Sequence, residues 1–164
     1  MNTRAHLPDP ATAPDLFDGV VQRRMMAFAV DAALLLAVSG VLLLVGVIAG
    51  LFTFGVAWLA LPVVLPVAIL AYYAATLGSS MRATPGMAMM DIVLVPTNGY
   101  PRDGWKALIH PLAFWITIWI SWPISLLVLL FTPRRQTIAD LISGTLMLRR
   151  SPMQQHWSAR RARA

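Results

Sequence analysis

Residues 32–81 decide the fold: AALLLAVSGVLLLVGVIAGLFTFGVAWLALPVVLPVAILAYYAATLGSSM contains no aspartate, glutamate, lysine or arginine. A soluble domain of this size cannot place fifty such residues in succession without exposing a large apolar surface. Lipid is the natural solvent for a stretch of this kind. The sequence therefore predicts an all-α integral membrane protein, built as a small bundle of transmembrane helices.

The composition of the whole chain agrees with this prediction. Its 164 residues are 58% hydrophobic and 12% charged, whereas soluble domains average about 25% charged residues. The chain has no cysteine, so it can form neither disulfides nor thiolate metal sites. The first 24 residues contain no apolar run, so we expect no removable signal peptide. The first apolar helix would then itself direct insertion.

Working outward from residues 32–81, the pattern predicts three apolar segments, at 25–48, 56–77 and 107–131. A helix that rises about 1.5 Å per residue needs about 20 residues to cross a hydrocarbon core of about 30 Å. Each segment is long enough. The third is interrupted by prolines, so it either crosses once or breaks at Pro123 into a hairpin that returns.

These segments suggest a polar leader (1–22), a transmembrane domain (23–149) and a basic tail (150–164). Outside the apolar segments, two runs are rich in strand-forming residues, Asp91–Val95 and Thr145–Arg149. We hypothesise that they pair as a small β-like patch over the cytoplasmic face of the membrane.

The distribution of Lys and Arg predicts the orientation. The leader up to Arg24 has three, the turn after the first segment none, the 78–106 loop three and the chain after Phe131 seven. By the positive-inside rule the N-terminus and the 78–106 loop are cytoplasmic. We favour a cytoplasmic tail as well, in contact with anionic lipid head groups. No nucleic-acid recognition module accompanies the net charge of +6, so nucleic acid is not an expected partner.

Two charged residues enter the first apolar segment. Arg24 and Asp31 are seven positions apart, about 700° of helical rotation and about 10.5 Å of rise, so they share one face. A direct contact over this distance would be strained, and a third group between them would fit better. A carboxylate inside the membrane costs about 2.5 to 3.5 kcal/mol unless it is paired or hydrated. Asp31 therefore needs partners.

A further acid, Asp140, lies in the run RRQTIADLISGT at residues 134–145. An arginine entering the first span, an aspartate seven residues later and a second aspartate in an Arg-Gln-x-x-x-Asp-x-x-x-Gly-Thr context resemble the RDD family of bacterial membrane proteins. The Thr-Pro-Gly turn followed by Ile92–Val95 resembles the loop that follows the family's second span. The resemblance covers residues 18–149. Its motif residues are Arg24, Asp31, Thr84, Pro85, Gly86, Gln136, Asp140, Gly144 and Thr145.

The resemblance implies a multi-pass protein of the bacterial inner membrane, with a function that is not established and a suggestion of ion or small-solute transport. The chain departs from the family pattern at two positions. Met87 stands where members commonly have a basic residue, and Ala139 where they commonly have a histidine. A charge or proton relay through those two side chains is therefore not expected here.

Two interpretations of Arg24, Asp31 and Asp140 stay open. They form either an ion-pair clasp that pins the tail to the first helix, or a site at which Asp31 exchanges protons or binds a monovalent ion. The first suits a non-transporting scaffold or assembly partner, and the second suits transport by a homo-oligomer. Gly46 and Gly50 form a small-xxx-small pair that predicts close helix packing, within one chain or between two.

We expect no enzymatic activity, no cofactor and no metal. The sequence has no phosphate-binding glycine loop, no His-Glu-x-x-His helix and no serine nucleophile elbow. His110 has no neighbouring ligand residues in the sequence, so a capping or interfacial role is predicted for it. Trp115, Trp119 and Trp122 predict an aromatic helix face that packs against lipid or a neighbour.

Overall fold

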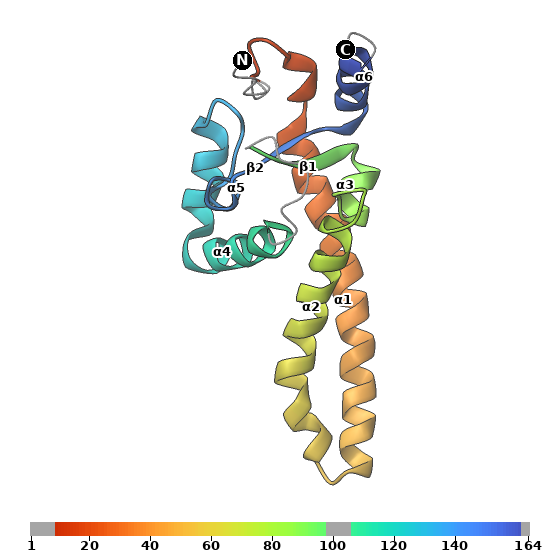
Figure 1. Cartoon of the computed structure of the whole chain (residues 1–164). Helices are drawn as coiled ribbons and strands as arrows, with labels where there is room; N and C mark the ends of the chain where they lie inside the picture. The colour runs from red at the N-terminus through yellow and green to blue at the C-terminus, as the bar shows by residue number, and fades with distance from the viewer. Residues whose placement is uncertain (1–8, 98–105, 162–164) are drawn as a thin grey trace.

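Two long apolar helices dominate the computed structural model, which describes residues 9–97 and 106–161. Helix α1 (Val20–Phe52) is followed by a short 3-10 turn, η2 (Val56–Ala60), and by α2 (Leu61–Leu77). The helices lie side by side as an antiparallel hairpin that extends well beyond the rest of the molecule (Figure 1). By length and composition, both are apolar enough to cross a membrane.

The hairpin follows the predicted segments with small differences. The second segment, 56–77, coincides with η2 and α2 together, whereas the helix that contains 25–48 is longer at both ends. At the tip, Gly55 has φ +90°, a conformation that side chains disfavour, and its N–H donates to the Gly50 carbonyl at 2.7 Å. The chain therefore reverses direction within three residues of the end of α1.

The remaining elements surround the first turns of α1 (Figure 1). The two strands form an antiparallel sheet in which Ile92 faces Arg149 and Pro96 faces Thr145. The hypothesised β pairing is thus present, one residue later than expected at its start. The elements are η1 (Pro14–Leu16), α3 (Pro85–Met89), β1 (Ile92–Pro96), α4 (Lys106–Phe131), α5 (Ile138–Ser143), β2 (Thr145–Arg149) and α6 (Arg150–Arg161).

Helix α4 corresponds to the third apolar segment, and it does not run straight. It contains two prolines and changes direction along its length, as Figure 1 shows. The strands before and after it belong to one sheet, and His110 near its start lies 3.5 Å from Asp140 of α5 (Nδ1 to Oδ1). The segment therefore returns to the end of the molecule from which it starts. Within the described residues, two helical stretches are long and apolar enough to cross a membrane, Pro14–Phe52 and Val56–Leu77.

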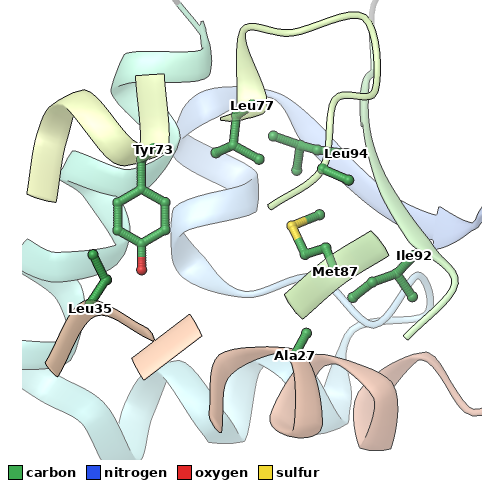
Figure 2. Packing of buried hydrophobic residues seen from close by; sticks show 8 residues of the cluster. Ala27, Leu35, Tyr73, Leu77, Met87, Ile92 and Leu94 are labelled. Atoms are coloured by element: carbon green, nitrogen blue, oxygen red, sulfur yellow. The ribbon is translucent and has the colours of Figure 1, made fainter. Parts of the chain in front are cut away.

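The larger hydrophobic cluster lies where α1, α2, α3 and β1 meet. Figure 2 shows Met87 of α3 between Ala27 of α1 and Leu94 of β1, with Tyr73 of α2 above Leu35. Farther along the hairpin the large apolar side chains are exposed. This is the surface expected of helices that lipid surrounds.

A second cluster joins the leader to the end of the chain. Leu16 and Phe17 pack against Leu146 and Leu148 of β2 and Met153 of α6. Between residues 9 and 19 the leader contains one regular element, η1, and two of its apolar side chains, Leu16 and Phe17, are buried. The tail begins as helix α6, and the buried side chain of Met153 completes this cluster.

Candidate functional site

Asp31 is the centre of the first polar site, where it is only 4% exposed. Its Oδ1 accepts hydrogen bonds from the Tyr72 hydroxyl at 2.7 Å and from the Gly86 N–H at 2.8 Å. Its Oδ2 accepts from the Thr84 hydroxyl. Because α1 and α2 are antiparallel, Tyr72 near the end of α2 stands opposite Asp31 near the start of α1. Three segments therefore meet on one carboxylate.

The Thr-Pro-Gly turn is shaped to reach this carboxylate. Thr84 is the N-cap of α3 and accepts from the Met87 N–H, so the first turn of the helix faces α1. A Cβ at Gly86 would lie 2.3 Å from the Ala27 carbonyl oxygen and 2.8 Å from Asp31 Oδ1. Only glycine permits this close approach of the backbone to α1.

All three donors to Asp31 are neutral. Among the ion pairs of the described residues, none includes Asp31. Arg24, which helical spacing places on the same face of α1, pairs with Asp140 instead. A buried carboxylate without a basic partner is costly when ionised. Three donated hydrogen bonds offset part of that cost, and a proton or a bound cation would remove the negative charge.

The second polar site is built on Asp140 of α5, which is fully buried. Arg24 donates from Nη1 to Asp140 Oδ2 at 2.6 Å, and the Thr137 N–H donates to the same oxygen at 2.9 Å. The Asp140 N–H in turn donates to the Thr137 hydroxyl, which completes a capping box at the start of α5. The ion pair thereby ties α5 to the first helix.

His110 also belongs to this second site. The sequence had predicted only a capping or interfacial role for this residue. Its Nδ1 lies 3.2 Å from the Ser143 hydroxyl, 3.3 Å from the Thr145 hydroxyl and 3.5 Å from Asp140 Oδ1. Gln136 donates from Nε2 to the Thr145 carbonyl at 2.9 Å. The signal in the sequence was a histidine inside an otherwise apolar segment, since such a residue needs a polar partner.

The structure divides the predicted set of Arg24, Asp31 and Asp140, which corrects the idea of one three-residue clasp. Arg24 pairs with Asp140, and Asp31 is held by Tyr72 and by the turn before α3. The physical reason is the rise of about 10.5 Å between the two α1 residues, which other polar groups fill. The contact of Tyr72 with Asp31 was not predicted from the sequence.

The remaining residues singled out in the sequence end a helix or pack between elements. Gly144 ends α5 at φ +60°, where glycine is favoured. A Cβ at Gly46 would meet Leu61, and one at Gly50 would meet Trp58, so these glycines pack within one chain. Trp115 packs against the larger hydrophobic cluster, whereas the side chains of Trp119 and Trp122 lie outside the described residues. In the described part of the chain, no group of three or more His, Asp or Glu side chains could hold a metal ion.

The family model described as the RDD family matches residues 19–144 of the chain. The chain belongs to the RDD family. The matched part of this RDD protein includes both polar sites and both long apolar helices, and RDD proteins are a membrane family. Neither a curated protein nor a solved structure matches the chain.

Proposed function

We propose that this RDD protein moves protons or monovalent cations across the bacterial inner membrane, with Asp31 as the group that binds them. One observation carries the proposal: Asp31 is 4% exposed, accepts hydrogen bonds from neutral donors, and forms none of the ion pairs found among the described residues. An ionisable side chain buried at a membrane helix, without a fixed counter-charge, is a candidate for reversible neutralisation.

The hairpin supports a position for Asp31 at the edge of the hydrocarbon. Asp31 and Phe52 are 21 positions apart on one helix, about 31 Å, which matches a hydrocarbon core of about 30 Å. Phe52 and Phe54 at the tip are 82% and 99% exposed, as suits contact with lipid at the far side. With the hairpin upright, Asp31 would lie at the near boundary, within reach of water and ions.

The chemistry of the first site suits a proton or a hard monovalent cation. Asp31 supplies two carboxylate oxygens, and Tyr72 and Thr84 supply hydroxyl oxygens, which can serve as ligands when their hydrogens turn away. A proton and a cation would each neutralise the carboxylate, so they would compete for it. Such competition is the basis for coupling the movement of one to the movement of the other.

The proposed topology places the N-terminus, the sheet and the tail in the cytoplasm. Its support is the positive-inside count together with the pairing of β1 and β2, which keeps both flanks of α4 on one side. Two crossing helices cannot enclose a path for ions alone. We therefore propose that the protein acts as a homo-oligomer and not as an enzyme. Lipid contact by the basic tail stays a prediction. Helix α6, with which the tail begins, lies at the end of the molecule opposite the hairpin tip (Figure 1).

A second candidate function is a membrane scaffold, and a specific observation favours it. The donors to Asp31 lie 41 to 55 positions away along the chain, and the Arg24–Asp140 pair joins residues 116 positions apart. Contacts of this kind also serve to hold the C-terminal half on the hairpin. In that case both polar sites would shape a cytoplasmic surface for an assembly partner.

Flux measurements on purified protein in liposomes separate the two candidates. The variants are Asp31→Asn, which keeps the shape of the side chain, and Asp18→Asn as a matched control, since the Asp18 side chain is 78% exposed. With an internal pH dye and an imposed Na⁺ or K⁺ gradient, we expect flux in wild type and Asp18→Asn and its loss in monodisperse Asp31→Asn. Equal flux in all three would reject Asp31 as the binding group, and no flux in wild type would favour the scaffold.

A further inference from the structure

Helix α4 and the neighbouring α5 carry six large apolar side chains that are at least half exposed in the described part of the chain. Four of them recur at spacings of four, three and four along α4, so they lie on one helix face. The other two come from α5. We call the surface that they form the α4–α5 face; its members, with their exposed fractions, are Ile120 (78%), Ile124 (54%), Leu127 (50%), Phe131 (81%), Leu141 (52%) and Ile142 (62%).

Lipid cannot cover all of this face if the hairpin stands upright in the bilayer. Leu141 follows Asp140, which contacts Arg24, and Arg24 is about 10 Å along α1 beyond Asp31. Pro133, two residues after Phe131, lines the same surface hollow as Met25 and Val20, which are about 9 Å and about 16 Å beyond Asp31. The head-group region on each side is only about 5 to 8 Å thick. The upper part of the face therefore lies outside the hydrocarbon.

The face has the character of an interface between identical chains. Residues 107–131 carry no charged side chain, and cores of homodimer interfaces are apolar and depleted of charge. Six side chains of roughly 100 Å² each give roughly 600 Å² per copy, near the roughly 800 Å² that each partner buries in a stable complex. A purely apolar face is complementary to itself, as a two-fold contact requires.

We propose that the α4–α5 face is the surface through which two copies of this chain associate. The pairing would remove exposed isoleucine, leucine and phenylalanine side chains from water and head groups, which is the main driving force available to them. It places the shared surface on the cytoplasmic side of the hairpin, next to the second polar site. The inference rests on α4 and α5 and does not depend on cation binding at Asp31.

Cysteine cross-linking tests the proposal, because the chain has no native thiol. Ile124→Cys and Leu127→Cys place a thiol near the middle of the face. Leu36→Cys is the matched control, since Leu36 is 73% exposed on α1 at the level of the hydrocarbon. The purified chain would be reconstituted at high lipid dilution and treated with a short bismaleimide. We expect covalent dimers from both α4 variants and only background from the control.

A mass measurement in detergent provides the second readout. We expect wild type to have the mass of two chains and monodisperse Ile124→Glu to have the mass of one. A monomeric wild type without α4 cross-links would overturn the proposal, and so would dimers that form through Leu36→Cys alone. Dimers without ion flux would keep this inference and reject the proposed function. Flux from a strict monomer would overturn this inference and the proposed homo-oligomer, and would leave Asp31 as the proposed binding group.

Discussion

Gly86→Ala is the substitution that tests the architecture of the Asp31 site most directly. The new methyl group would lie 2.3 Å from the Ala27 carbonyl oxygen and 2.8 Å from the Asp31 carboxylate. The Ala27 oxygen belongs to the backbone of α1 and cannot give way, so α3 itself must move away. That movement would break the hydrogen bond from the Gly86 N–H to Asp31 Oδ1.

The expected cost follows from two contributions. A hydrogen bond to a charged group contributes about 1.5 to 3 kcal/mol. Overpacking a closely fitted contact costs about 1 to 3 kcal/mol. The higher helix propensity of alanine returns up to about 1 kcal/mol. We therefore expect Gly86→Ala to lower the free energy of unfolding by about 1.5 to 6 kcal/mol.

Unfolding by denaturing detergent in mixed micelles, followed by circular dichroism, measures this quantity. Gly40→Ala is the matched control, because a Cβ at Gly40 would meet no atom within 4 Å. We expect the control to be as stable as wild type or slightly more so. If Gly86→Ala unfolds at the same detergent fraction as Gly40→Ala, the close approach of α3 to α1 does not hold Asp31 in place.

Two further predictions use the same titration. Asp140→Asn leaves Arg24 buried without its ion-pair partner and should lower the free energy of unfolding by about 3 to 5 kcal/mol. Asp18→Asn, at a pair with an exposed carboxylate, should lower it by less than about 1 kcal/mol. Equal losses in the two variants would contradict the buried pair. Gly50→Ala places a Cβ 1.8 Å from Trp58 Nε1 and should cost about 1 to 3 kcal/mol without changing the oligomer mass. A changed mass with unchanged stability would show that Gly50 packs between chains.

The two long apolar helices could be predicted from the sequence because lipid imposes a strong pattern. Residues 32–81 lack charge, and the hairpin turn at Gly55 is the one short interruption between two runs of sufficient length. This pattern can be recognised without knowing which other elements the two helices pack against. The family could be recognised for another reason, since Arg24, Asp31 and Asp140 stand in motifs with a fixed spacing of residues.

The partners of those charged residues could not be predicted. Helical spacing places Arg24 and Asp31 on one face of α1 but does not say which side of α2 turns toward that face, so the contact of Tyr72 with Asp31 was not predicted. The path of α4 was also open, because an uncharged run suits a crossing, a hairpin and a buried helix equally. Only the pairing of β1 with β2 shows that the chain returns.

The order in which the chain is synthesised gives the Asp31 contacts a consequence for biogenesis. Asp31 leaves the ribosome 41 residues before Tyr72 and 53 before Thr84, and Arg24 leaves it 116 residues before Asp140. The first helix must therefore wait in or beside the translocon with an unpaired carboxylate while the rest of the protein is made. A nascent chain that stops before Thr84 would carry an exposed polar defect, which is a feature that membrane quality control can recognise.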